Sequence, residues 1–486
     1  MLEALKVKVN KIFIFYFTTF VLFFLLFGYL LLETNISLIL VGKVFIFLSF
    51  LLILPIGNFF RNVIIFLPLS LILKLSINFN YIVSPLHLKP ALSNIVLPFK
   101  MFNLFVLIFI FFLFLYFLSG NKLKEKVPFF NFLIILSSLN FLSILWSLKK
   151  DYAFLNSFMF LINSFYYFIG FLYFKEKKDL NLLLLSLLIF LVFNFLISFF
   201  QYFLPDSIIA RFWKVEIGEY YWSLRVKGVF YHSNSYSAFI NLALIMILSF
   251  ILYSESRLLK YSLIFILFSA VFTIFLTFSR AGYLSLFLSI YFFCFFYLLK
   301  KGKAKILIFY TILTIILFAI FLFIIKLISP SIYLRFESIL WGRREISILI
   351  RTIFWKEAIK IFINNPIKGL GSGQFAFTDF SQIHLHAHNA FLNFLVELGI
   401  LGFIVFIVFL YKIFRFLLDI FRKTNEREIF LIIGLITGWI SIIFQLFFDY
   451  YWLNAIYDME IKFFFLYILI TILLTKFYFK EKLQIP

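Results

Sequence analysis

The chain has 486 residues, of which 64% are hydrophobic and only 14% are charged. Soluble globular domains are about half apolar and about a quarter charged, so this composition excludes an ordinary soluble protein. The net charge of +22 would suggest nucleic-acid binding in a soluble protein, but in a membrane protein basic residues collect on one side of the bilayer.

Transmembrane helices are predicted wherever about 20 consecutive residues are mostly apolar. The first run follows three lysines and extends to about Leu32, which is too long for a cleavable signal peptide and indicates a signal anchor. About 14 runs qualify, and about 12 is the alternative count, because Lys74 weakens the third run. The predicted spans are 11–32, 36–56, 63–80, 101–119, 128–146, 153–174, 180–203, 235–254, 261–278, 283–299, 305–327, 389–412, 429–448 and 457–476.

The distribution of Lys and Arg gives the orientation, since these residues concentrate in cytoplasmic loops. With the N-terminus in the cytoplasm, the short loops on the outer side contain only Lys149, Lys150 and Arg280. The large basic clusters then fall on the cytoplasmic side: Lys122–Lys126, Lys175–Lys178, Arg257–Lys260, Lys300–Lys305, Lys412–Arg427 and Lys476–Lys482. This bias explains most of the net charge without nucleic acid.

The predicted outer segment 204–234 ends with two cations, Arg225 and Lys227, directly before Gly228. Glycine lets a backbone approach a ligand closely. Asn234 follows at the start of the next apolar run, where the free N–H groups of a helix favour anions. The segment therefore indicates an anion-binding site, and an ordinary basic loop beside the membrane is the alternative.

The next outer turn is short and contains Arg280 between two apolar runs. Its position runs against the bias of basic residues toward the cytoplasm. A charge at this depth is usually functional or paired. The alternative is an arginine whose side chain extends to the lipid headgroups.

The outer segment 328–388 is the richest in polar residues, with Arg343, Arg344, Arg351 and Lys356 in its first half. Pro366 is then followed by glycines at alternate positions, 369, 371 and 373. Such a run cannot continue a helix, and it suits a close backbone approach to a phosphate or a sugar. A plain turn is the more common explanation of a lone glycine run.

Three histidines, His384, His386 and His388, end this segment directly before an apolar run. Alternation would place them on one side of an extended strand. A metal site is one interpretation, because histidine is the commonest metal ligand. However, Asp379 is the only carboxylate nearby in sequence, and the single cysteine rules out cysteine-rich metal sites. A general base or acceptor-binding histidine is therefore favoured, because imidazole titrates near neutral pH.

Charge counting alone thus places Arg225, Arg280, Arg351 and the histidines on the same face. Cations together with an imidazole suit an anionic leaving group and a hydroxyl nucleophile.

These motifs resemble those of the bacterial O-antigen ligases. His388 and Asn389, followed after nine residues by Gly399 and Gly402, look like that family's His-Asn-x9-Gly-x-x-Gly signature. The turn Arg280–Leu284 is similar to its short Arg-x-x-x-Leu motif.

Two further segments carry the same resemblance. The segment Arg225–Asn234 resembles the family's loop Arg-x-x-Gly-x-Phe-x-x-Pro-Asn, with Ser233 where proline is common. Trp355 and the glycine run after Pro366 resemble its long periplasmic loop. The resemblance covers about residues 180 to 415, with the motifs in order.

The resemblance implies an all-α polytopic membrane protein of the glycosyltransferase-C type with a large periplasmic loop, in the bacterial inner membrane. Residues 1–180 would form N-terminal transmembrane helices. Residues 181–415 would form the ligase-like core, with the outer segments 204–234 and 328–388, and residues 416–486 the C-terminal helices.

The family resemblance also implies an activity. Its members take a glycan from undecaprenyl diphosphate, and ligases pass it to a sugar hydroxyl of the lipid A core, in an inverting transfer without a metal or other cofactor. By motif position His388 is the expected base, and Arg225 and Arg280 are the expected diphosphate ligands. Other substrate-binding residues are expected to be Lys227, Asn234, Arg351, His386 and Asn389.

Glu397 follows His388 by nine residues, about half a turn away on an ideal helix. It is therefore expected to be a packing or structural residue and not the partner that orients the base.

Three alternatives remain open. An O-antigen polymerase and a protein O-oligosaccharyltransferase share these motifs. A polysaccharide flippase or transporter would instead need charges facing a cavity near mid-membrane. Scattered candidates for such charges are Lys43, Lys74, Lys326 and Lys462.

Overall fold

The computed structural model describes residues 59–72, 76–78, 98–100, 126–217, 224–328, 346–378, 386–424, 426–450 and 458–479, with Val106, Ile110, Tyr333 and Leu453. This part of the chain is an all-α polytopic membrane protein, which confirms the predicted fold class. The predicted spans 11–32, 36–56 and almost all of 101–119 lie outside the described residues.

Eight described helices are long and apolar enough to cross a bilayer. They are α7 (Lys150–Tyr173), α8 (Lys177–Phe203), α10 (Ser233–Tyr253), α11 (Arg257–Leu276), α12 (Arg280–Lys300), α16 (Ala390–Lys423), α17 (Ile429–Leu446) and α18 (Asp458–Tyr478).

The other described elements are eight further helices and four short strands. The helices are α4 (Phe59–Ile72), α6 (Phe130–Ser143), η3 (Ile144–Trp146), α9 (Ile208–Phe212), α13 (Ala304–Ile328), α15 (Ile346–Asn364), η4 (Gln374–Phe377) and η5 (Glu426–Glu428). Two antiparallel ribbons pair β1 (Ser76–Asn78) with β2 (Pro98–Lys100) and β3 (Glu216–Ile217) with β4 (Leu224–Arg225).

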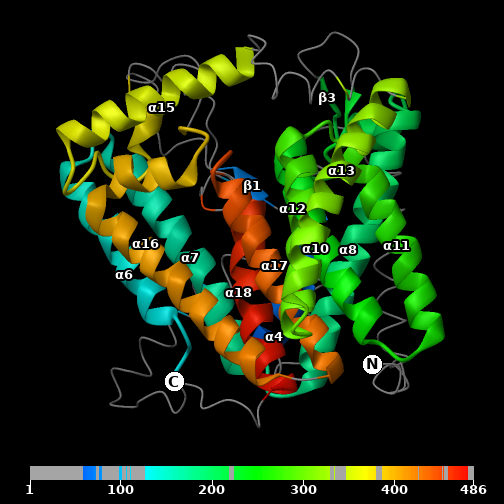
Figure 1. Ribbon diagram of the computed structural model, residues 1–486. Coiled ribbons are helices and arrows are strands. Elements are labelled where there is room, and N and C mark those ends of the chain that lie inside the picture. Colours follow the sequence, from blue (N-terminus) through cyan, green and yellow to red (C-terminus); the bar gives the residue numbers. More distant parts are fainter. Residues whose placement is uncertain are drawn as a thin grey trace.

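Helices α10, α17 and α18 form the centre of the bundle (Figure 1). In their most apolar stretches 78%, 78% and 83% of the residues are buried, against 22% in α11, so the first three pack on protein and α11 faces outward. Small residues allow this packing, as where Gly434 of α17 lies against Ser249 of α10. Trp439 donates its indole N–H to Thr471 across the α17–α18 contact, at 3.1 Å.

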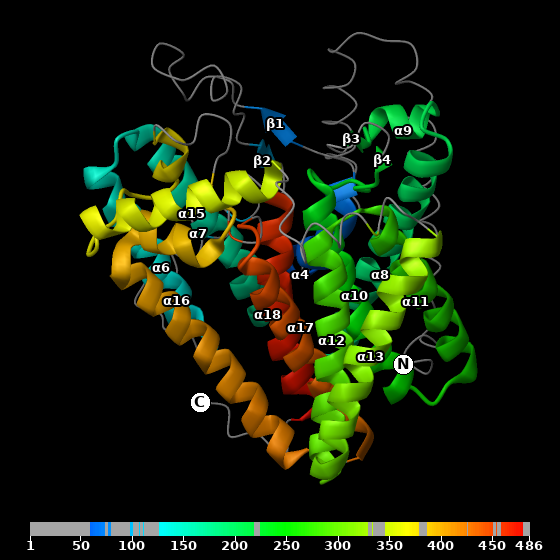
Figure 2. The ribbon, with the colours of Figure 1, turned by 45° about the horizontal axis from the view of Figure 1, so that its top comes forward.

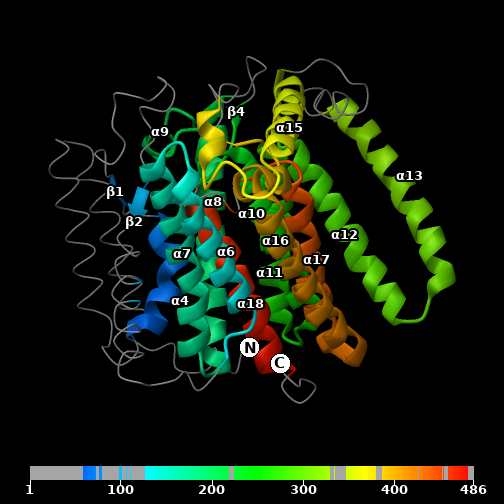
Figure 3. The ribbon, with the colours of Figure 1, turned by 90° about the vertical axis from the view of Figure 1, so that its left-hand side faces the viewer.

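Helix α13 packs on α12 at the edge of the bundle (Figure 3). Its Phe309 and Phe323 are exposed, as are Phe265 and Phe268 of α11. Large apolar side chains in such numbers on two surface helices fit a surface in contact with lipid.

Helix α15 lies across one end of the bundle, above the ends of α6, α7 and α16 (Figures 1 and 2). We call this end the α15 end. The sequence predicted only an outer segment over 328–388, without this helix. The stretch 346–364 contains no glycine or proline, so nothing in it interrupts a helix.

The described helices alternate in direction along the chain (Figure 1). Helices α10, α12, α16 and α18 begin at the α15 end, whereas α8, α11 and α17 finish there. The described basic residues of the predicted cytoplasmic clusters, such as Lys177, Arg257, Lys300 and Lys423, therefore lie at the opposite end.

Candidate functional site

The loop that carries two of the three predicted histidines lies at the α15 end, directly before α16. His388 has φ 51°, in the left-handed region, so the backbone turns here and the predicted extended strand is wrong for residues 386–388. His384 lies outside the described residues.

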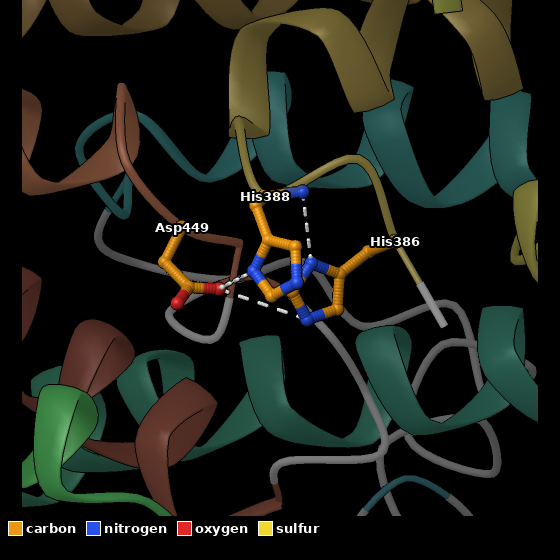
Figure 4. A group of neighbouring side chains, drawn as sticks. All are labelled: His386, His388 and Asp449. Carbon is orange, nitrogen blue, oxygen red and sulfur yellow. Dashed lines mark hydrogen bonds and ion pairs between the residues drawn. The ribbon is translucent and has the colours of Figure 1, made fainter. Parts of the chain in front are cut away.

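Both described imidazoles approach one carboxylate oxygen of Asp449, the third residue after α17 (Figure 4). Asp449 Oδ1 lies 3.5 Å from His388 Nδ1 and 3.6 Å from His386 Nε2. The two rings are in edge-to-face contact, with centroids 4.5 Å apart. These are ion-pair distances, and catalytic hydrogen bonds are often this long before substrate binds.

A hydrogen bond to His386 and an ion-pair contact of His388 indicate which ring nitrogens carry protons. The backbone N–H of His388 donates to His386 Nδ1 at 3.1 Å, so the proton of a neutral His386 is on Nε2, which faces Asp449. His388 turns its Nδ1 to the same carboxylate. A neutral His388 that donates from Nδ1 carries its lone pair on Nε2, the nitrogen that can accept a proton.

Asp449 is buried, with 7% of its surface exposed, yet it is held as an anion. Burial alone would raise its pKa. Its contacts with His388 and His386 and the charge of Arg351 outweigh burial and lower the pKa of Asp449 well below its usual range. The structure therefore brings the predicted site residues His386 and His388 together at an aspartate that the sequence had not singled out, and the charge of Arg351 acts on the same aspartate.

Helix α15 packs against the loop that carries His386 and His388, which we call the histidine loop. Trp355 donates its indole N–H to the carbonyl of Ala387 at 3.1 Å. The ring of Phe354 lies almost parallel to that of His388, with 6.5 Å between centroids. Asn389, predicted to bind substrate, caps α16 by accepting the backbone N–H groups of Phe391 and Leu392.

The glycine run after Pro366, which we call the glycine loop (residues 366–373), approaches the backbone of α16. Leu370 N–H donates to Val396 O and Gly371 N–H to Glu397 O, each at 2.8 Å. Gly369 has φ +66°, and a Cβ there would lie 2.6 Å from the carbonyl groups of Val396 and Glu397. The glycines thus let the loop dock on α16, and these two N–H groups are engaged with protein.

A second polar cluster at the α15 end contains Arg225, in the ribbon β3–β4. Its guanidinium donates to Glu216 Oε1 and Asn234 Oδ1, both at 2.9 Å, and to the carbonyl of Thr277 at 3.0 Å. The backbone of Val226 also donates to Leu276 O. The predicted residues Arg225 and Asn234 are therefore in direct contact, and their loop is attached to the turn between α11 and α12.

At the start of α10, where the sequence predicted an anion-binding site, the anion is the carboxylate of Glu216 from the chain itself. Glu216 Oε2 accepts the backbone N–H of Ser233 at 2.8 Å and lies 3.9 Å from His232 Nδ1. Burial would raise the pKa of Glu216, but the hydrogen bond with His232 and the charge of Arg225 lower it to about 2. This helix start attracts negative charge, as expected.

Lys227 and Gly228 pack against α8. The backbone N–H groups of both residues donate to Gln201 Oε1 at 3.0 Å, and Gly228, with φ +54°, lies against the side chain of Asn194. The Lys227 ammonium donates to the carbonyl of Tyr231. Partial burial lowers the pKa of Lys227, against the opposing charge of Glu216.

Arg280 is the first residue of α12, after the capping residue Ser279. Because the Arg225 loop is attached to this turn, Arg225 and Arg280 belong to neighbouring loops at the α15 end.

The donor atoms of His386, His388 and Asp449 lie within 4.8 Å of one another, and two imidazoles with a carboxylate are a set that transition metals accept. The hydrogen bonds oppose that use. His386 would have to lose the proton on Nε2, and a neutral ring would then need a proton on Nδ1, where it accepts the N–H of His388. The residue types fit a metal, whereas the hydrogen bonding fits protonated donors that face a carboxylate.

Sequence reasoning missed Asp449 and Glu216. Asp449 had one signal, because it is a carboxylate directly after a predicted span, on the face that carries the other site residues. Glu216 lay within the segment 204–234 without a motif around it.

Fold and site together define a multi-pass membrane protein with an imidazole–carboxylate centre at the α15 end. The family model described as O-antigen ligase matches residues 265–407, which include Arg280, the glycine loop and His388. Residues 265–407 therefore match an O-antigen ligase domain, as the motifs predicted, and this match supports a function of the ligase or polymerase type in general. No curated protein matches the chain.

Proposed function

We propose that this protein transfers a glycan from undecaprenyl diphosphate to a hydroxyl group of the lipid A core, at the periplasmic face of the bacterial inner membrane. The observation that carries the proposal is the contact of His388 with a buried, ionised Asp449 at 3.5 Å. The family match supports glycosyl transfer in general. The basic residues at the opposite end of the bundle support an orientation with the α15 end outside.

In the proposed reaction His388 Nε2 takes the proton of the acceptor hydroxyl as its oxygen attacks the anomeric carbon. One C–O bond forms on one face of the sugar, and the bond to the diphosphate breaks on the other, so the configuration inverts. The electron pair leaves with the diphosphate. Asp449 stabilises the imidazolium that forms, and a positioned base of this kind contributes about 10²- to 10⁴-fold.

Arg225 and Arg280 are proposed to stabilise the diphosphate, with Lys227 and Asn234 beside them. A cation about 4 Å from a phosphate contributes at most about 4 kcal/mol at an effective dielectric of 20. Glu216 holds Arg225 in place and keeps the helix start of α10 compatible with anions. Arg351, His386 and Asn389 are assigned to the acceptor side, because they surround His388 in the sequence or in space.

The test is a reconstituted transfer with purified protein, undecaprenyl diphosphate-linked glycan and lipid A core. The product expected is glycan joined to the core, with inverted anomeric configuration. Glycan chains of increasing length on the lipid carrier would instead identify a polymerase, and glycan on an added protein would identify a protein O-oligosaccharyltransferase. Movement of the lipid-linked glycan across liposomes, without any transfer product, would overturn the proposal in favour of a flippase.

A further inference from the structure

The peptide between the two histidines is tied to a buried carboxylate that the proposed reaction does not use. Ala387 N–H donates to Asn393 Oδ1 at 2.7 Å, and Asn393 Nδ2 donates to Glu397 Oε1 at 3.2 Å. Asn393 and Glu397 are 0% and 3% exposed, and they lie one turn apart on α16. A satisfied buried chain of this kind specifies a single geometry.

The direction of each hydrogen bond in this chain is forced. A backbone N–H can only donate, so Asn393 must turn its oxygen to Ala387 and its NH₂ group to Glu397. The second carboxylate oxygen, Glu397 Oε2, accepts the backbone N–H of Gly373 at 3.0 Å. Both oxygens of Glu397 therefore act as acceptors, which a carboxylate provides and an amide does not.

Ala387 is held at both of its polar backbone groups. Its N–H donates to Asn393, and its carbonyl accepts the indole N–H of Trp355. His386 and His388 are the residues on either side, and both point at Asp449. Movement of this peptide would shift both imidazoles away from the carboxylate.

We propose that Glu397 is a positioning residue for transfer: through Asn393 it fixes the Ala387 peptide, and it joins the histidine loop to the glycine loop at Gly373. This inference rests on the proposed function in one respect, since it takes His388 as the base. Glu397 acts at a distance of two hydrogen bonds, without contact with His388, whereas the sequence had predicted a structural residue with no part in orienting the base.

Glu397→Gln tests the proposal directly. The NH₂ group of the new glutamine must face another hydrogen-bond donor, either Asn393 Nδ2 or the N–H of Gly373. Asn393 cannot relieve this by rotating its amide, because its NH₂ group would then face the N–H of Ala387. A misplacement of about 1 Å near the chemistry costs about 100-fold, so we expect kcat to fall by about that factor with little change in the KM for the lipid-linked donor.

The double variant Asn393→Asp/Glu397→Gln is the matched rescue. In the double variant the carboxylate at position 393 accepts from the N–H of Ala387 and from the NH₂ group of the new glutamine. The oxygen of that glutamine still accepts from the N–H of Gly373, so every donor has an acceptor again. We expect kcat to return to within about tenfold of the wild type. Asn393→Asp alone places two carboxylates together and is expected to stay impaired.

Folding is checked by size-exclusion chromatography and thermal unfolding in detergent, with kcat measured well below each midpoint. Gly434→Ala, which adds a methyl group against Ser249 away from the site, serves as the destabilised control that keeps its kcat. If Glu397→Gln does not fold, Asn393→Ala replaces it, with the same fall in kcat expected.

Wild-type kcat in Glu397→Gln, or a double variant no better than the single one, would overturn the proposal. His388→Ala is measured in the same series to separate the two claims. Full activity of His388→Ala together with loss and rescue at position 397 would remove the base assignment and leave the positioning role standing.

Discussion

His388 and Asp449 come from different helix ends, before α16 and after α17, and meet at 3.5 Å at the α15 end of the bundle. The contact joins an imidazole to a buried anion whose pKa is well below its usual range. An anion on Nδ1 keeps the other ring nitrogen available as a base and stabilises the imidazolium that forms, which is the logic of histidine–aspartate pairs in hydrolases.

Asp449→Asn is expected to reduce kcat by at least about 100-fold, because the amide keeps the shape but removes the charge that supports the imidazolium. The measurement is initial-rate transfer by purified protein. Asp419→Asn is the matched control, since Asp419 is exposed at the opposite end and pairs with Arg422. Equal rates for both variants would contradict the role of Asp449.

Because of Glu216, the stability of the folded protein is expected to decrease at acidic pH. Its pKa in the folded protein is about 2, below its usual 4.5, so its contribution is fully present above about pH 4.5 and is lost as the pH falls toward 2. The unfolding midpoint of the wild type should therefore fall more steeply between pH 6 and pH 3 than that of Glu216→Gln.

Glu255→Gln is the control for that experiment, since Glu255 forms an exposed pair with Arg427 at the opposite end. Its midpoint should follow the wild-type curve. Parallel curves for the wild type and Glu216→Gln would mean that the Arg225 cluster does not hold Glu216 as an anion.

Gly399→Ala is expected to destabilise the protein by more than backbone strain alone. Gly399 has φ +64°, which costs other residues about 1 to 3 kcal/mol, and a Cβ there would collide with the carbonyl of Ile367. Gly302→Ala isolates the strain, because Gly302 has φ +68° with open space around it. Equal shifts of the two unfolding midpoints would show that the glycine loop is not docked on α16.

Transfer is expected to be unchanged in EDTA, because His386 Nδ1 accepts a backbone N–H and its Nε2 therefore carries the proton where a metal would bind. The assay compares rates before and after chelation. Loss of activity that a divalent ion restores would instead make His386, His388 and Asp449 a metal site.

Most of the described helices could be predicted from sequence, because the thickness of the bilayer fixes the length of an apolar run. The expected span 235–254 corresponds to α10 at Ser233–Tyr253. Helix α15 was missed because it lies across the end of the bundle, where no such length rule applies.

The site was predictable only where its residues are neighbours in sequence. The motif around His388 and Asn389 was visible, whereas Asp449 follows a different helix and carries no pattern of its own. The glycine run was recognised as a close approach, but only the fold could show that its partner is the backbone of α16.

The central claim is that His388 is the base for glycosyl transfer, and His388→Ala in the reconstituted assay tests it most directly. With the variant folded and inserted as the wild type is, we expect transfer from undecaprenyl diphosphate-linked glycan to lipid A core to fall by about 10²- to 10⁴-fold. Product formation at the wild-type rate would contradict the claim.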